Sequence, residues 1–229
     1  MSDPQPRKLV IAIDGPAGAG KSTIASRLAR KLGYVNLESG AMYRALALQA
    51  ILNDVSFDDA AALLRLAEKS IIELQPQIDG NRVLLDRQDV SRRIRERDVT
   101  EAASRVSVHP AVRQWMVARQ REMGTRGGLI MEGRDIGTVV FPEADVKVFL
   151  DADPAVRAER RIEQAQSNND PDAAKKLAED LKRRDERDKT RAVSPLEPAK
   201  DALVLDSSQL GIDQVLERIE ALIADRLKS

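Results

Sequence analysis

The 229-residue sequence contains no cysteine and a single histidine, His109. Without cysteine, the chain has no disulfides, no thiolate catalysis and no thiolate metal site. One histidine excludes a multi-histidine metal site. Because His109 stands directly before Pro110, it is typical of a turn or helix entry rather than of a catalyst. Any catalytic or binding site must therefore be built mainly from other residue types.

The sequence also lacks net charge and long hydrophobic runs. Lys plus Arg and Asp plus Glu are both 37. A general nucleic-acid binder normally carries a basic excess, so we expect no nucleic-acid partner. The apolar run at 9–13 is too short for a signal peptide, and no segment approaches the length of a membrane span. We expect a cytoplasmic protein without a membrane partner, and a monomer, since no heptad pattern or long exposed apolar run calls for self-association.

What the sequence does contain is an alternation of short apolar runs and helical patterns. Near-continuous apolar runs of this length are typical of strands buried on both faces of a parallel sheet. The runs occupy 9–13, 34–37, 128–132, 146–150 and 202–206. Helical patterns follow at 24–32, where Ile24, Leu28 and Leu32 recur every four residues before Gly33, at 110–123, after Asp153 and Pro154, and at 211–227. Together they predict a doubly wound α/β sheet.

Two stretches break this alternation. Residues 70–104 contain two extended runs joined by the turn signal Asp79-Gly80-Asn81, which predicts a small antiparallel insertion. The polar, turn-rich stretch 164–175 predicts a mobile loop between two charged helices.

The strongest motif is Gly15-Pro16-Ala17-Gly18-Ala19-Gly20-Lys21-Ser22, which matches the phosphate-loop pattern G-x-x-x-x-G-K-[ST] between a strand and a helix. Its glycines let backbone N–H groups converge on anionic oxygens, and the helix N-terminus adds its positive end. In such a loop Lys21 reaches the β- and γ-phosphates, and the Ser22 hydroxyl is a ligand for Mg²⁺.

The motif alone does not say how a nucleotide is used. The chain has neither the N-K-x-D nor the D-x-x-G element expected of a GTPase switch, and little room for the further modules of a motor. Donation of phosphate to a small acceptor fits best. An acid at a strand end could support the metal, and Asp135, Asp151 and Asp206 remain three alternatives.

Arginines mark a second phosphate site. Arginine binds phosphate oxygens bidentately and stays charged, and an acceptor that is already a phosphate anion needs no general base. Arg44 ends the stretch 38–44, and Arg134 lies at the carboxyl end of the third strand, where open α/β sheets bind ligands. Arg184, Asp188 and Arg191 share one helix face, but their spacing alone favours a solvated surface, as it does for Arg157, Arg160 and Arg161.

Over nearly its whole length the chain resembles the nucleoside monophosphate kinases, and within them the bacterial cytidylate kinases. The motifs that carry this resemblance are SGAMYR, GRDIGTVVFPEADVKVFL and RDERDKTRAVSPLEPAKDALVLDS, together with the insertion at 70–104. The resemblance implies a five-stranded parallel core with helices on both faces, a monophosphate-binding domain and a short lid. The core would comprise 7–38, 107–155 and 190–229, the monophosphate-binding domain 39–106 and the lid 156–189.

The resemblance also implies roles for single residues, and it reverses the surface interpretation of 183–191. Gly15 to Thr23 would hold the ATP phosphates. The phosphate of CMP would be held by Ser39, Arg44, Arg134 and Arg191, the cytosine by Ser104, Arg113 and Asp135, and the sugar hydroxyls by Arg184 and Asp188. Lys21, Arg134, Arg160 and Arg191 would be catalytic, with Arg160 as the lid arginine.

The implied reaction is Mg²⁺-dependent transfer of the ATP γ-phosphate to CMP and dCMP. One departure from the family is Glu38, where an aspartate commonly precedes Ser-Gly-Ala. Two alternatives stay open: a kinase of another small acceptor, such as UMP or a hydroxyl compound, and a nucleotide-gated binding module that hydrolyses ATP slowly.

Overall fold

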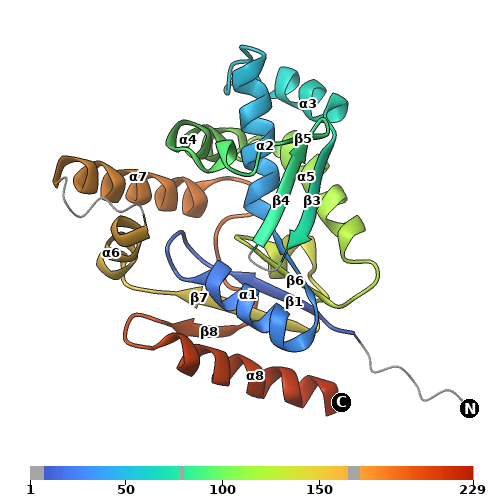
Figure 1. Cartoon of the computed structure of the whole chain (residues 1–229), viewed down its shortest axis with the longest axis vertical. Coiled ribbons are helices and arrows are strands. Elements are labelled where there is room, and N and C mark those ends of the chain that lie inside the picture. Colours follow the sequence, from blue (N-terminus) through green and yellow to red (C-terminus); the bar gives the residue numbers. More distant parts are fainter. Residues whose placement is uncertain (1–7, 78–79, 165–170, 229) are drawn as a thin grey trace, which may run out of the picture.

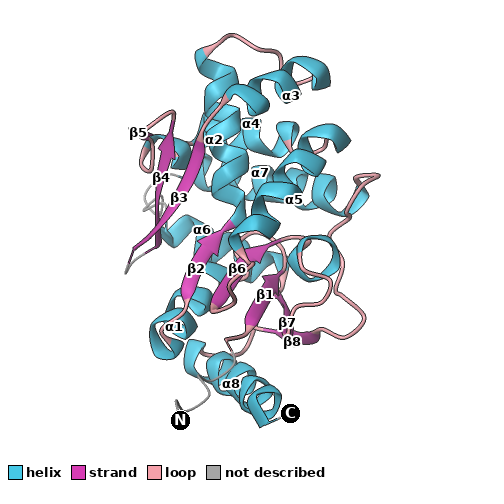
Figure 2. Ribbon diagram, turned by 90° about the vertical axis from the view of Figure 1, so that its right-hand side faces the viewer, coloured by secondary structure: helices cyan, strands magenta, loops and turns pink. Residues whose placement is uncertain are grey.

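The computed structural model describes residues 8–77, 80–164 and 171–228. Within them, one sheet contains five parallel strands in the order β2-β6-β1-β7-β8 (Figure 1; all five are labelled in Figure 2). The strands are β1 (Val10–Asp14), β2 (Val35–Glu38), β6 (Leu129–Gly133), β7 (Val146–Asp151) and β8 (Leu203–Asp206). Each coincides with one of the apolar runs, so the expected parallel core is confirmed.

Helices cover both faces of this sheet (Figure 2). Ile11 and Ile13 of β1 pack toward α1 (Lys21–Leu32) and α8 (Ile212–Lys228), while Ala12 between them belongs to the opposite face. This alternation follows from the two-residue period of a strand. The opposite face carries α2 (Ser39–Leu52) and α5 (Pro110–Met123), and the doubly wound arrangement is confirmed.

The expected insertion is antiparallel only in its first half. A three-stranded sheet contains β3 (Ile72–Gln77), β4 (Gly80–Leu85) and β5 (Gln88–Asp89). The second half is helical, with the short turn η1 (Arg93–Arg95) and α4 (Arg97–Val106). Residues 78 and 79 of the predicted turn lie outside the described residues.

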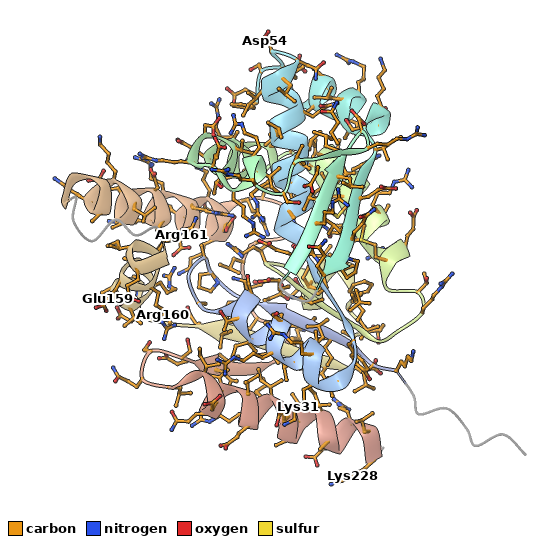
Figure 3. All side chains as sticks on the ribbon, in the orientation of Figure 1. Lys31, Asp54, Glu159, Arg160, Arg161 and Lys228 are labelled. Atoms are coloured by element: carbon orange, nitrogen blue, oxygen red, sulfur yellow. The ribbon has the colours of Figure 1, made fainter. Side chains whose placement is uncertain are left out.

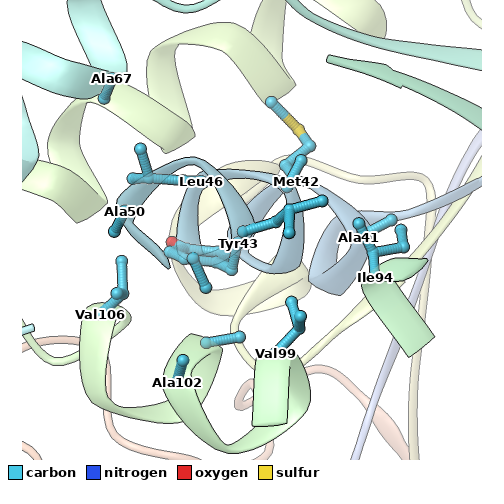
Figure 4. Close-up of a cluster of buried hydrophobic side chains, with 14 of the residues drawn as sticks. Ala41, Met42, Tyr43, Leu46, Ala50, Ala67, Ile94, Val99, Ala102 and Val106 are labelled. Atoms are coloured by element: carbon cyan, nitrogen blue, oxygen red, sulfur yellow. The ribbon is translucent and has the colours of Figure 1, made fainter. Parts of the chain in front are cut away.

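A hydrophobic core separate from the main sheet supports this half of the molecule. Figure 4 shows α2 between α3 (Ala60–Lys69) and α4: Leu46 lies on the side of Ala67 of α3, and Val99 of α4 lies on the opposite side. The hairpin is tied to the main sheet by Asn81, whose amide donates to the Asn36 carbonyl at 2.7 Å and whose Oδ1 accepts the Glu38 N–H at 2.8 Å. The insertion is thereby held beside the carboxyl end of β2.

Two charged helices, α6 (Pro154–Gln164) and α7 (Pro171–Thr190), follow β7. Asp153 accepts the Ala155 N–H at 2.8 Å, as expected for the start of α6. The predicted loop at 164–175 is wrong for 164, which ends α6, and for 171–175, which are helical because Pro171 opens α7. Residues 165–170 lie outside the described residues. No helix in the described part of the chain is both long and apolar enough to cross a membrane.

Candidate active site

A cleft of about 710 Å³ opens at the carboxyl ends of β1, β2 and β6, between the phosphate loop and α7. Within the described residues, ten arginines and Lys21 line it against six carboxylates. In a chain without net charge, this concentration of positive groups favours polyanionic ligands. The predicted residues that line the cleft are Ala17, Gly18, Gly20, Lys21, Ser22, Thr23, Ser39, Arg44, Ser104, Arg113, Arg134, Asp135, Arg184, Asp188 and Arg191.

The phosphate loop has a conformation that requires glycine. Gly15 has φ +145°, and a Cβ there would lie 1.9 Å from the Leu150 carbonyl oxygen. Gly18 has φ +79°, and its Cβ would lie 2.9 Å from the Arg157 carbonyl oxygen. Gly20 precedes α1, whose N-terminus receives no side-chain cap. The loop therefore presents backbone N–H groups and a helix N-terminus to the cleft, as an anion site needs.

Two oppositely charged groups sit beside this loop. Lys21 is buried and its Nζ donates to the Pro16 carbonyl at 2.6 Å. Burial, reinforced by the Arg134 guanidinium, lowers the pKa of Lys21 to about 7. Burial and the neighbouring Glu38 carboxylate raise the pKa of Glu132 to about 7. A phosphate beside Lys21 would favour its charged form.

The sequence patterns assign no role to Glu132. This residue ends the apolar run at 128–132, so the pattern predicts a strand residue and nothing more. In the sheet it pairs in register with Glu38, and both carboxylates line the cleft. Asp151 and Asp206, two of the three acids considered for the metal, do not line it. Asp151 accepts the N–H of the next residue at 2.8 Å, and Asp206 accepts that of Ser208 at 2.8 Å.

The arginines predicted to bind the acceptor phosphate are held by carboxylates. Arg44 Nη2 lies 2.7 Å from Glu38 Oε1, and Arg134 Nε lies 2.9 Å from Asp188 Oδ2. Arg191 Nη1 lies 3.8 Å from Asp188 Oδ1. Although burial opposes ionisation, the guanidiniums around Asp188 lower its pKa. These carboxylates fix the forks of the arginines and leave the cleft with excess positive charge.

Arg184 belongs to the same cluster. It lines the cleft one turn before Asp188, and burial together with the Arg134 guanidinium lowers the pKa of Arg184 to about 10. The face of α7 that carries Arg184 and Asp188 is therefore turned into the cleft rather than toward solvent. Glu38, the departure from the family pattern, holds Arg44 and also lies 3.5 Å from Arg95 Nη2.

Deeper in the cleft, a second set of polar groups surrounds a buried ion pair. Arg113 donates to Asp135, and its Nη1 donates to the Ser107 carbonyl at 3.1 Å. The Arg113 guanidinium lies 5.6 Å from the centre of the Tyr43 ring. The buried Ser104 hydroxyl has no hydrogen-bond partner within the described structure. An uncommitted hydroxyl beside a buried arginine and carboxylate suits a small heterocycle with donors and acceptors.

The structure does not bring Arg160 to the cleft. Arg160 Nη2 donates to the Ser207 carbonyl at 2.8 Å, on the β8 side of α6, whereas Arg161 lines the cleft. Figure 3 shows Arg161 between α6 and α7 and Arg160 nearer to β8. Neighbouring residues on a helix point about 100° apart, so the sequence alone could not show which of the two arginines faces the cleft.

The parallel sheet, its phosphate loop and the arginine-lined cleft define a phosphate-loop kinase. The family model for cytidylate kinase matches residues 11–225. The cytidylate kinase of Solibacter usitatus (strain Ellin6076) is 47% identical over 229 residues, covering 99% of this chain and 97% of the relative. That of Aeromonas hydrophila is 47% identical over 218 residues, covering 95% of each chain. The chain belongs to the cytidylate kinase family of phosphotransferases, which act on small nucleotides.

A crystal structure of an uncharacterized protein from Eubacterium ventriosum is similar in fold alone. Its TM-score is 0.50 at 11% identity, and the match covers 95% of this chain and 99% of that one. The resemblance drawn from the sequence motifs is confirmed by the family match. The roles of the single site residues stay predictions.

Proposed function

We propose that this protein transfers the γ-phosphate of ATP to CMP and dCMP in a Mg²⁺-dependent reaction, giving ADP with CDP or dCDP. The observation that carries the proposal is one cleft lined by two separate sets of groups that suit phosphate. The backbone loop Gly15–Ser22 borders one side, and Arg44, Arg134 and Arg191 border the other. A hydrolytic switch has no use for the second set of arginines.

On the donor side, Lys21 would hold the β- and γ-phosphates. Mg²⁺ prefers oxygen ligands and usually keeps several waters, so it needs few protein groups. The exposed Ser22 hydroxyl and the Glu132 carboxylate both line the cleft and suit that preference. Within the described residues, no group of three or more acids and histidines could hold a metal ion. When bound, Mg²⁺ would neutralise charge on the phosphate oxygens.

On the acceptor side, the CMP phosphate is itself the nucleophile and needs no general base. The only histidine supports this, since His109 Nε2 lies 2.7 Å from the Phe57 carbonyl oxygen and does not line the cleft. Arg44, Arg134 and Arg191 would neutralise and orient the acceptor, with Ser39 beside them. Their fork geometry matches the oxygens of the transferring phosphoryl group.

The base would lie against the Arg113–Asp135 pair. The cytosine amine can donate to the Asp135 carboxylate or the Ser104 hydroxyl, and Arg113 can donate to the acceptor edge. Uracil lacks that amine and would leave buried acceptors unpaired, so the site should discriminate against it. Arg184 and Asp188 would bind the sugar hydroxyls.

The proposal includes the predicted lid at 156–189 and monophosphate-binding domain at 39–106. Both would close over the substrates and exclude water. The first residue of α4 already contacts the middle of α7, since Arg97 Nη2 lies 2.6 Å from Asp180 Oδ2. Arg160 could act only if closure released it from Ser207, whereas Arg161 already lines the cleft. We further propose that the protein acts as a cytoplasmic monomer.

The test is ADP production from Mg-ATP with CMP, dCMP, UMP, AMP, GMP or TMP as the second substrate, repeated with EDTA. Strong stimulation by CMP and dCMP, abolished by EDTA, is the expected result. If another monophosphate stimulated ADP production most, that nucleotide, and not CMP, would be the acceptor. Slow ATP hydrolysis that no monophosphate changes would favour the binding-module alternative.

A further inference from the structure

Asp14 is a buried carboxylate that none of the predicted roles uses. It ends β1 and directly precedes Gly15 of the phosphate loop, yet it does not line the cleft. Its carboxylate points to the neighbouring chain segment instead. Oδ1 accepts the Ile136 N–H at 2.8 Å and Oδ2 accepts the Gly137 N–H at 2.7 Å.

These two N–H groups begin the π-helical turn η2 (Ile136–Val140), which follows Arg134 and Asp135 without an intervening residue. The first N–H groups of a helical turn have no partner within the turn. The Asp14 carboxylate satisfies two of them at once, and so fixes the direction in which the chain leaves β6. An asparagine could accept only one of these hydrogen bonds well, because its side chain has one acceptor oxygen and one donor NH₂ group.

The far end of the same turn is held as well. Arg121 of α5 donates from Nε to the Val140 carbonyl at 2.9 Å and from Nη2 to the Val139 carbonyl at 2.6 Å. A Cβ at Gly137 would lie 3.4 Å from Asp14 Oδ2, so the turn packs closely on the carboxylate. The end held by Asp14 is the one that adjoins Arg134 and Asp135.

Burying an ionised carboxylate opposes folding unless hydrogen bonds compensate for the lost water. Burial raises the pKa of Asp14 to about 6, while the Ile136 and Gly137 N–H groups act in the opposite direction. A neutral side chain would avoid this cost. The two hydrogen bonds are therefore the contribution that only the carboxylate supplies.

We propose that Asp14 is a positioning residue for the acceptor site, holding Arg134 and Asp135 through the backbone of η2, although it adjoins the donor-phosphate loop in sequence. This inference rests on the proposed function, in which Arg134 and Asp135 contact the monophosphate. It predicts that loss of the carboxylate weakens the binding of CMP rather than the binding of ATP. A role in shaping the phosphate loop predicts the reverse.

The test compares Asp14→Asn with the wild type in calorimetric binding of CMP and of a non-hydrolysable ATP analogue, in kcat, and in amide hydrogen exchange. We expect CMP affinity to fall about tenfold or more, from the loss of one charged hydrogen bond, with a comparable fall in kcat. Affinity for the ATP analogue should stay within about threefold. The Ile136 and Gly137 amides should exchange at least about tenfold faster.

The matched control is Asp145→Asn. Asp145 Oδ2 accepts the Val10 N–H at 2.8 Å, at the opposite end of β1, so this variant loses the same kind of contact away from the cleft. It should lower stability without changing the affinity for either nucleotide. Asp14→Ser, which leaves room for a water, replaces Asp14→Asn if the latter does not fold.

Unchanged CMP affinity in Asp14→Asn, or ATP-analogue affinity that falls as far as CMP affinity, would overturn the inference. Failure of the proposed function is a separate result, because it appears as a wild-type protein that does not phosphorylate CMP. In that case the exchange rates still decide whether Asp14 holds the turn, and unchanged rates would exclude it.

Discussion

The two sides of the cleft, the proposed donor side and the proposed acceptor side, are built in opposite ways. The donor side is eight consecutive residues, Gly15 to Ser22, whose backbone geometry makes the site. The acceptor side gathers side chains from separate parts of the chain, in the ranges 38–44, 104–113, 132–135 and 184–191. The donor side needs only a local backbone conformation, whereas the acceptor side forms only when β2, β6, α5 and α7 have packed together.

The two sides also differ in how they are kept ready for an anion. On the donor side, the loop leaves no room for a Cβ atom at Gly15 or Gly18. On the acceptor side, guanidiniums are held in place by carboxylates such as Glu38, Asp135 and Asp188. We therefore expect the donor side to be sensitive to shape, and the acceptor side to charge and hydrogen bonding.

The largest effect is expected for Arg134→Ala. This change removes a guanidinium proposed to stabilise the transferring phosphoryl group and leaves Asp188 without its 2.9 Å partner. We expect kcat with CMP to fall on the order of 10³-fold, as for other transition-state arginines. ATP-analogue affinity should change little, and Arg134→Lys should recover only part of the rate, since it restores charge without the fork. Near-normal turnover in Arg134→Ala would remove Arg134 from catalysis.

Arg160 and Arg161 give the next largest contrast. Arg161→Ala should lower kcat on the order of 10²-fold, as for removal of one preorganised donor, because Arg161 lines the cleft. Arg160→Ala should lower kcat less and act on stability, because it loses the hydrogen bond to the Ser207 carbonyl. Steady-state kinetics and thermal unfolding of both variants separate the two. A greater loss of turnover in Arg160→Ala would restore the lid role predicted from the family resemblance.

On the donor side, Gly18→Ala tests sensitivity to shape. The positive φ of +79° and the 2.9 Å approach to Arg157 both oppose a methyl group. A left-handed conformation costs a residue with a side chain about 1–2 kcal/mol, so the free variant loop should relax and must regain this conformation to bind. ATP-analogue affinity should therefore fall by roughly 5- to 30-fold while CMP affinity is kept. Gly33→Ala is the matched control. It has φ +65° with open space around it, and should lose only stability.

Asp14 joins the two sides, and its titration gives a smaller effect on stability. Burial raises its pKa from 3.8 to about 6, so the folded protein keeps this proton at a pH where the unfolded chain has lost it. Its contribution to stability is therefore greatest below about pH 4, and declines until about pH 6. Compared with Asp14→Asn, the wild-type free energy of unfolding should fall by about 2 kcal/mol between about pH 4.5 and pH 7. Urea denaturation measures this, and parallel pH curves would contradict it.

Local signals predicted most of the fold. Five apolar runs became five strands, and the proline and glycine signals at Pro110, Pro154 and Gly33 marked helix ends correctly. The order of the strands was beyond reach, because neighbours such as β1 and β6 are paired by tertiary packing. The helical second half of the insertion was missed. Its residues are highly charged, and the hairpin signal before them is the stronger pattern.

The site was predictable where its residues are contiguous or end a strand. For Arg184 and Asp188 the spacing alone predicted a solvent-exposed helix face, because the sequence of α7 does not show that this helix lies across the cleft. Glu132 and Tyr43 were assigned no role, since a buried acid at a strand end and an aromatic within a helix have ordinary structural explanations. The contacts that distinguish them come from other elements of the fold.

The smallest expected effect concerns the base. Arg113→Met keeps much of the side-chain volume but removes the partner of Asp135 and the donors proposed for cytosine. We expect the ratio of kcat/KM for CMP to that for UMP to fall about tenfold, corresponding to one lost polar contact, with a smaller change in the rate for the best remaining acceptor. Thermal unfolding would check that the buried Asp135 does not destabilise the fold. An unchanged ratio would mean that cytosine is recognised elsewhere in the cleft. The acceptor side would then share the donor side's reliance on shape.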